Sequence, residues 1–152
     1  MEALWQMLQR GEPIEELSSA FDRLSAEGDF EEIGERLLSL DDGLRLHAVA
    51  ALEMADNPLV VGTLAALYED VLDSVRERSL LILNRLGGDV LAEPMVSGLM
   101  LEDPVPAVRA AAVLALAVSR SPKARSLMLE ALEDEPDAGV RARLEAQLRK
   151  LG

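Results

Sequence analysis

The sequence predicts an all-α protein, a right-handed α-solenoid (superhelix) of helical hairpins with about nine helices. Two observations carry this prediction. A pattern of about 32 residues recurs along the chain, as it does in stacked repeat proteins. Aromatic residues make up only 3% of the 152 residues, and all-β folds generally hold more. The length is typical of one domain, which we expect to span residues 1–152.

Four segments carry the repeat. In each, an apolar residue precedes an arginine, and a leucine follows the arginine by seven positions, which is about two helical turns. The arginines are Arg45, Arg76, Arg109 and Arg141, and the leucines are Leu52, Leu83, Leu116 and Leu148. Successive arginines are 31, 33 and 32 residues apart. Each segment is therefore predicted to form the same helix of an equivalent hairpin.

Other helices are expected between these four. They are predicted over residues 58–69, 91–101 and 122–133. Asn57 precedes Pro58, which places a capping side chain before a proline at the first helical position. Gly87 and Gly88 are expected to close the preceding helix in the left-handed conformation. Helices of about 12 residues are marginal alone in water, so these must stack on one another.

The N-terminal third is less regular than the rest. Its apolar spacing predicts helices over residues 2–9, 12–26 and 29–40. We interpret residues 1–42 as an N-terminal cap with a degenerate repeat, and residues 43–136 as three clear repeats. Residues 137–152 are expected to form a capping helix with a polar outer face, which solenoids need at their ends.

The repeated pattern resembles HEAT repeats, particularly the short bacterial type related to phycobilin-lyase repeats. The resemblance lies in an acidic residue, often a proline, then Val-Arg and an alanine- and leucine-rich helix. The best copy is LEDPVPAVRAAAVLALA, and further copies are LYEDVLDSVRERSLLIL and EDEPDAGVRARLEAQL. The resemblance covers residues 29–152. It implies a fold more than a function, because one scaffold serves many tasks.

The resemblance also implies a ladder of acidic residues and arginines along the stack. The matching pairs, each six residues apart, are Asp70 with Arg76, Asp103 with Arg109, and Glu135 with Arg141. We favour this structural role over nucleic-acid binding, because a net charge of −13 repels a phosphate backbone.

Composition excludes several kinds of site. The chain has no cysteine, which rules out disulfides, thiolate metal sites and cysteine catalysis. Its one histidine, His47, has no carboxylate or nucleophile at a defined spacing. Neither a signal peptide nor an apolar run of membrane length is present. We therefore expect a cytoplasmic protein that is not an enzyme and holds no metal or cofactor.

The second helix of the middle repeat is a candidate binding face, since second helices line the concave side in HEAT repeats. Glu93 and Ser97 are its polar residues, and apolar residues cover most of its circumference. Either this helix is buried deep in the stack, or it exposes Met100 or Leu101 beside Tyr68 as an apolar binding patch.

Trp5 and the acidic N-terminal end are two further candidates. Trp5 lies on the apolar edge of a short helix, which either folds onto the first repeat as a cap or docks into another molecule's groove. Residues 1–42 hold 12 acids and 3 bases, whereas residues 105–152 hold 6 acids and 8 bases. The acidic end serves either solubility or the attraction of a basic segment of a partner.

The leading hypothesis from the sequence is a non-catalytic scaffold or adaptor that binds a protein segment on the concave helix face. One alternative, implied by the resemblance alone, is an accessory subunit or chaperone of a phycobilin-lyase-like enzyme. Another is an assembly protein that associates with itself through its ends. None of the three involves nucleic acid or a membrane, and the sequence leaves the oligomeric state open.

Overall fold

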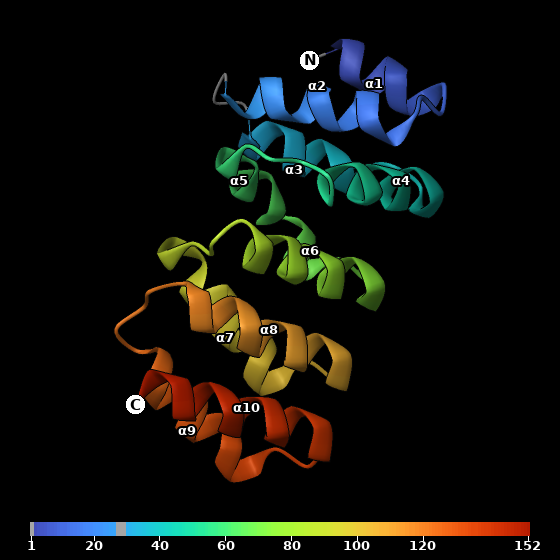
Figure 1. Cartoon of the computed structure of the whole chain (residues 1–152). Helices are drawn as coiled ribbons and strands as arrows, with labels where there is room; N and C mark the ends of the chain where they lie inside the picture. Colours follow the sequence, from blue (N-terminus) through green and yellow to red (C-terminus); the bar gives the residue numbers. More distant parts are fainter. Residues whose placement is uncertain (1, 27–29) are drawn as a thin grey trace.

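The computed structural model describes residues 2–26 and 30–152, and over these residues it contains helices and no strand (Figure 1). The α-helices are α1 (Glu2–Gln9), α2 (Ile14–Ala26), α3 (Phe30–Leu38), α4 (Asp42–Leu52), α5 (Val61–Leu64), α6 (Asp73–Arg85), α7 (Glu93–Glu102), α8 (Pro106–Val118), α9 (Ala124–Asp134) and α10 (Ala138–Leu151). The short 3₁₀ helices are η1 (Pro58–Val60), η2 (Leu67–Glu69) and η3 (Val90–Ala92). The predicted all-α solenoid is confirmed.

The helices stack in two layers along the molecule (Figure 1). In one layer α2, α4, α6, α8 and α10 pack each on the next. In the other layer α3 packs on α5, and α7 packs on α9. One apolar core, drawn from both layers, runs the length of the stack. A row of side chains at one edge of this core can therefore extend over several repeats.

Helix α8 shows why the first layer packs closely. Pro106 occupies its first turn, where a missing N–H costs nothing. Its buried face alternates valine and leucine with small alanines such as Ala112 and Ala115. Small residues let the neighbouring helices α6 and α10 approach on opposite sides. The middle of the stack is therefore filled mainly by aliphatic side chains, as the low aromatic content suggests.

The glycine pair after α6 forms the predicted cap. Gly87 and Gly88 have φ angles of 97° and 78°, both in the left-handed region. The N–H of Gly88 donates to the carbonyl of Leu83 at 2.8 Å, and that of Gly87 donates to Asn84 at 3.3 Å. This is the paired hydrogen bonding of a Schellman motif. A Cβ on Gly88 would also lie 2.8 Å from the backbone of Val118. Gly88 is therefore required for two reasons, its left-handed conformation and this close backbone contact.

The predicted continuous helix over residues 58–69 is wrong. The segment forms η1, the four-residue helix α5 and η2 in succession. Val60, Val61, Gly62 and Thr63 are all poor helix formers. Gly62 also receives the Phe30 ring, whose atoms would lie 2.8 Å from a Cβ at this position. The local sequence is weakly helical, and tertiary packing divides it into short turns.

The N-terminal helix α1 packs on α2 and α4 and closes that end of the stack. Trp5 is only 4% exposed, because Leu4, Trp5 and Leu8 share the face that joins the core. The guanidinium of Arg36 lies 4.3 Å from the centre of the Trp5 ring, at cation–π distance. The interpretation of Trp5 as an exposed docking residue is therefore wrong, since burying its large ring stabilises the cap.

Candidate binding surface

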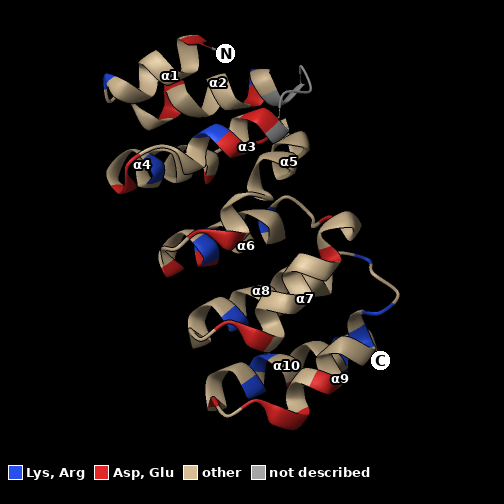
Figure 2. Cartoon of the chain, turned by 180° about the vertical axis from the view of Figure 1, so that it is seen from behind, with Lys and Arg blue, Asp and Glu red and all other residues tan. Residues whose placement is uncertain are grey.

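A ladder of arginines and carboxylates runs along the edge where α4, α6, α8 and α10 begin, and Figure 2 shows the charges alternating there. Arg76 donates from Nε and Nη2 to the two carboxylate oxygens of Asp103, at 2.8 and 3.1 Å. Arg109 binds Glu135 in the same way, at 2.7 and 3.0 Å. Bidentate geometry of this kind is the strongest form of this ion pair. Arg45 forms the first rung with Asp70.

The carboxylate partner of each arginine differs from the one expected. Arg76 was expected to pair with the carboxylate of Asp70, six residues earlier, but it binds that residue's backbone carbonyl at 2.9 Å. Arg109 likewise donates to the carbonyl of Asp103 at 2.8 Å, and Arg141 to that of Glu135 at 3.1 Å. Arg76, Arg109 and Arg141 therefore each fix their own turn through the backbone, and Arg76 and Arg109 also reach the carboxylate of the following repeat.

The ladder is electrostatically satisfied. Burial acts to raise the pKa of Glu135, but hydrogen bonds from Arg109 and from the N–H of Asp137 outweigh it and leave that pKa below its ordinary value. The hydrogen bond to Asp103 outweighs burial in the same way and raises the pKa of Arg76. Every charge in these pairs is neutralised by its partner, so the ladder holds repeats together and offers no free group for chemistry.

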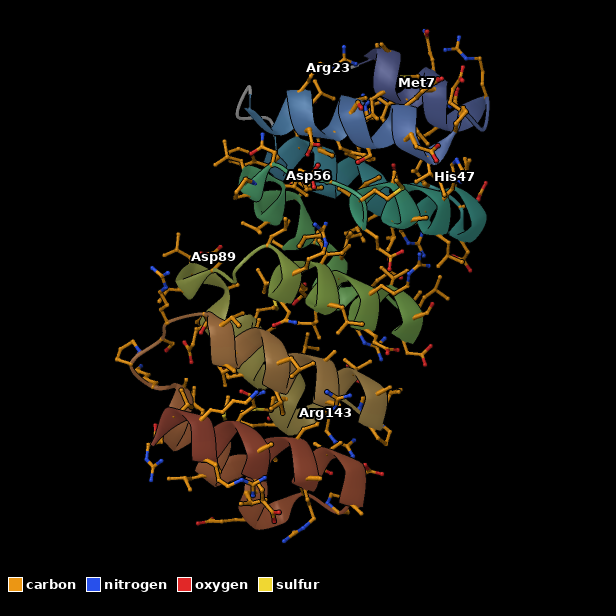
Figure 3. The ribbon with its side chains drawn as sticks, in the orientation of Figure 1. Met7, Arg23, His47, Asp56, Asp89 and Arg143 are labelled. Atoms are coloured by element: carbon orange, nitrogen blue, oxygen red, sulfur yellow. The ribbon has the colours of Figure 1, made fainter. Side chains whose placement is uncertain are left out.

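Three hollows lie along the second layer of helices. The first, which we call the apolar hollow, has a volume of about 480 Å³. Its lining includes Phe30, Leu59, Gly62, Tyr68, Leu91 and Met95. Leu91 is 86% exposed although it is a large apolar side chain. Asp89, which stands on the turn before η3 (Figure 3), is the one carboxylate in this lining, and it accepts the N–H of Leu91 at 3.0 Å.

The second, the central hollow, has a volume of about 360 Å³. Its lining includes Tyr68, Glu69, Arg76, Met95, Gly98 and Leu99. Tyr68 and Met95 line both this hollow and the apolar one. A Cβ on Gly98 would meet no atom within 4 Å, so the wall of the central hollow is open backbone at that point. The first two hollows are therefore neighbours along α7.

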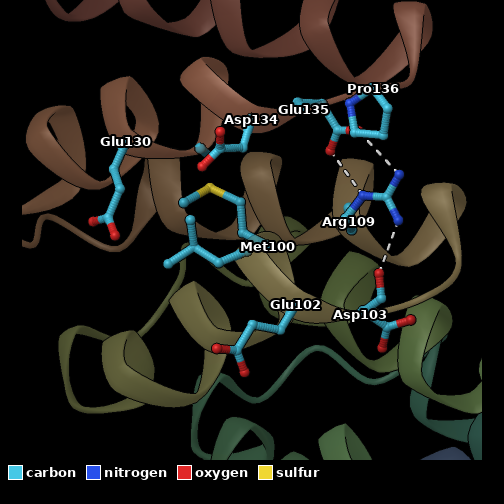
Figure 4. Close-up of a pocket in the computed structure, with 10 residues that line it drawn as sticks. Met100, Glu102, Asp103, Arg109, Glu130, Asp134, Glu135 and Pro136 are labelled. Carbon is cyan, nitrogen blue, oxygen red and sulfur yellow. Dashed lines mark hydrogen bonds and ion pairs between the residues drawn. The ribbon is translucent and has the colours of Figure 1, made fainter.

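The third, the acidic hollow, has a volume of about 380 Å³ and lies between α7 and α9. Its lining includes Met100, Leu101, Glu102, Arg109, Glu130 and Asp134, together with the ladder residues Asp103 and Glu135. Figure 4 shows Glu130 and Asp134 of α9 facing Glu102 of α7 with Met100 between them. Glu102 and Asp103 also line the central hollow, so the three hollows form one row.

The candidate binding residues predicted from the sequence are mostly covered. Met100 is buried, so the alternative in which it is exposed as an apolar binding patch is wrong. The candidates Tyr68 and Ser97 are buried as well. Neighbours on both sides of the middle repeat cover this helix, and its apolar circumference is core. Leu101 is exposed and lines the acidic hollow, whereas Glu93 is half-buried and lines none of the three hollows.

Tyr68, although buried, lines two of the hollows. Only 2% of the residue is exposed, and its hydroxyl has no hydrogen-bond partner among the described residues. Burial, with a smaller contribution from nearby Asp89, raises the pKa of this hydroxyl well above its ordinary value. The group is therefore a neutral donor without an acceptor, which costs free energy in the free protein.

Sequence reasoning missed the exposed walls of the apolar hollow. The sequence places Leu59 and Leu91 in the helices predicted over residues 58–69 and 91–101. In the structure both belong to 3₁₀ turns at the outer edge of the second layer. The available signal was the position of each leucine two residues after a capping residue, Asn57 or Asp89, where an apolar side chain has little core to reach.

The described residues show no arrangement for metal chemistry or a membrane span. No three His, Asp or Glu side chains converge as metal ligands within this part of the chain. No described helix is long and apolar enough to cross a bilayer. His47 lies on α4 (Figure 3), and its Nε2 is 2.9 Å from the carbonyl oxygen of Glu12, so the ring tethers the turn that joins α1 to α2.

Comparison with protein families gives one match. A family model for HEAT repeats matches residues 74–149, which is half of the chain and runs from α6 into α10. No curated protein and no solved structure matches the chain. HEAT repeats generally mediate contacts between proteins, and the proteins that they form are typically non-enzymatic scaffolds. The relation to phycobilin-lyase repeats stays a prediction. The chain belongs to the HEAT-repeat family.

Proposed function

We propose that the chain is a non-catalytic protein-binding scaffold or adaptor, and that it binds an apolar part of its partner in the apolar hollow. The observation that carries the proposal is the hollow itself, whose outer wall is formed by the exposed side chains of Leu59 and Leu91. Burying a leucine side chain stabilises a complex by about 1.5–3 kcal/mol. Apolar side chains gathered around a concavity are typical of a binding site.

The polar groups of the hollow also favour binding over catalysis. Tyr68 and Asp89 are its titratable members. The raised pKa of Tyr68 keeps its hydroxyl protonated, so it is a poor base. Asp89 is already engaged as the cap of η3. Neither group is paired with a nucleophile. A hydrogen-bond donor and a carboxylate in the lining can instead orient a bound segment.

Two equally exposed apolar residues provide a sharp test. Leu91 and Val71 are both 86% exposed, but only Leu91 lines the apolar hollow. The full-length chain is used to capture a partner from cells, and the purified partner is then titrated against Leu91→Asp and Val71→Asp. We expect Leu91→Asp to weaken binding by at least about tenfold, which is the loss of roughly 1.4 kcal/mol. Val71→Asp should bind as the parent does.

Circular dichroism and urea unfolding of both variants check that the fold is intact. Both positions are on the surface, so substitutions there should change stability by no more than about 0.5 kcal/mol. If the two variants bind equally well, or lose affinity equally, the apolar hollow is not the binding site.

A further inference from the structure

We propose that the partner segment bound by this scaffold has two chemically different parts. Its apolar part lies in the apolar hollow, and its lysine or arginine side chains lie in the acidic hollow. This inference rests on the proposed function and specifies the chemistry of the partner. Three features support it: the apolar hollow, the unpartnered hydroxyl of Tyr68, a residue that lines both the apolar and the central hollow, and the unpaired carboxylates of the acidic hollow.

The charges of the three hollows change along the row. The apolar hollow has one carboxylate in its lining, Asp89. The acidic hollow has five carboxylates and one cation, Arg109. A ligand that fills the whole row must therefore be apolar at one end and cationic at the other. Anionic lipid headgroups and nucleic-acid phosphates are repelled by the same carboxylates.

The carboxylates of the acidic hollow fall into two groups. Asp103 and Glu135 are buried and bound to ladder arginines. Glu102, Glu130 and Asp134 are exposed, and no described lysine or arginine lies within ion-pair distance of them. These three face one another around Met100 (Figure 4).

A lysine or arginine suits the shape and charge of this site. Its aliphatic stem would lie on the exposed Leu101, above the buried Met100, and its charge would lie among the three unpaired carboxylates. Charge-assisted hydrogen bonds to carboxylates are about twice as strong as neutral ones. The partner is thus a protein segment with basic residues.

Tyr68 marks where the backbone of the segment passes. Its hydroxyl is buried and has no acceptor among the described residues, yet the side chain lines the two hollows that an apolar segment would cross. A backbone carbonyl of the segment can accept this hydrogen bond. Leaving a buried donor unpaired is unfavourable, so binding that supplies an acceptor removes a penalty that the free protein carries.

Gly98 marks the path between the two ends. It faces the central hollow and has open space where a Cβ would stand. Because a Cβ at this position meets no atom within 4 Å, a large side chain here can extend into the central hollow. Gly98→Phe is therefore expected to block a segment that reaches from the apolar hollow to the acidic one.

The experiment uses random 16-residue peptides displayed on phage and selected against the immobilised full-length chain. We expect the selected peptides to carry an apolar cluster and a separate cluster of lysine or arginine. Synthetic copies with a fluorescent label are then titrated by anisotropy. Reversing Glu130 and Asp134 together to lysine should weaken binding by at least about tenfold at low salt, and less at high salt. Glu133→Lys, exposed on α9 outside the lining, is the matched control.

Tyr68→Phe separates a binding hydroxyl from a structural one. The substitution keeps the ring and removes only the unpartnered donor. We expect peptide affinity to fall by about fivefold while urea unfolding shows a fold at least as stable as the parent. A lower stability with unchanged affinity would mean that the hydroxyl has a structural role, and it would contradict the proposed path of the segment.

The failure of this inference differs from the failure of the proposed function. Some outcomes overturn the need for basic residues in the partner but leave the scaffold function standing. In these outcomes the peptides lose affinity for Leu91→Asp, but either they carry no basic residues or their affinity is unchanged by the reversal of Glu130 and Asp134 to lysine. Acidic residues among the selected peptides overturn that need as well. Peptides that bind Leu91→Asp and Gly98→Phe as strongly as the parent, or a selection with no peptide sensitive to Leu91→Asp, contradict the proposed function itself.

Discussion

At the scale of single residues, the ladder makes a quantitative prediction about stability. Arg109→Met leaves the buried carboxylate of Glu135 without its cation, and breaking a buried pair from one side destabilises a protein by about 3–5 kcal/mol. Arg141 occupies the equivalent position in the last repeat, but it is exposed and binds only backbone carbonyls. Arg141→Met should therefore lose no more than about 1 kcal/mol. Urea unfolding of both variants measures the difference, and equal losses would contradict the role of the ladder.

The pH dependence of stability follows from the same rung. The pKa of Glu135 is lower in the folded chain than its ordinary value of 4.5. The stability that this group contributes is therefore fully present above about pH 4.5, and it is lost as pH falls through the folded pKa. We expect the gap in unfolding free energy between the parent and Glu135→Gln to be widest near neutral pH and to close in acid. A gap that stays constant from pH 7 to pH 3 would show that the ionised carboxylate contributes nothing.

The sequence predicts which residues stand at the ladder positions, because a spacing near 32 residues places them in equivalent turns. It does not predict which carboxylate each arginine reaches. Asp70 is six residues from Arg76 along the chain, whereas Asp103 is 27 residues away. Only the register between stacked repeats brings Asp103 closer, and that register depends on packing across the core. Local spacing therefore identifies the participants of the ladder but not their pairing.

At the scale of helices, two glycines should respond in opposite ways to the same substitution. In α3, a Cβ on Gly34 would lie 2.8 Å from the carbonyl oxygen of Thr63, so Gly34→Ala forces α3 and α5 apart. Overpacking of this kind destabilises by about 1–3 kcal/mol. In α7, a Cβ on Gly98 meets nothing, so Gly98→Ala should stabilise by about 0.5–1 kcal/mol through helix propensity. Thermal unfolding measures both signs, and stabilisation by Gly34→Ala would refute the close approach of α3 and α5.

The second helix of the first repeat shows the limit of sequence patterns at this scale. Most of the predicted helices are present within about two residues of their expected bounds, because apolar periodicity and caps act locally. The segment at residues 58–69 breaks up for a tertiary reason, which is the Phe30 ring seated on Gly62. That break turns Leu59 outward and creates the apolar hollow. The proposed binding site is therefore the feature that the local pattern does not predict.

At the scale of the whole molecule, the first layer of helices is joined less firmly between α4 and α6 than within its C-terminal half. Helices α6, α8 and α10 pack on one another through aliphatic side chains. Between α4 and α6 the contact is smaller, and arginines bridge it: Arg85 donates to the carbonyl of Ala55 at 2.6 Å, and Arg78 pairs with Glu53. Arg45 and Asp70 form the ladder rung of this junction. Stacked repeats interact mainly with their nearest neighbours, so a weak junction can separate cooperative units.

We therefore expect native-state hydrogen exchange to reveal two units, with amides of α2 and α4 opening at lower free energy than those of α6, α8 and α10. Replacing Arg45 and Arg78 together with methionine should lower protection in α2 and α4 and leave protection in α8 and α10 unchanged. Arg143→Met, on the exposed face of α10 (Figure 3), is the control and should alter neither unit. If the double variant lowers protection uniformly along the chain, the stack unfolds as one unit and the junction is not a boundary. Two units instead predict that a bound segment, which contacts residues on both sides of the junction in the apolar hollow, raises protection most in the less stable unit, α2 and α4.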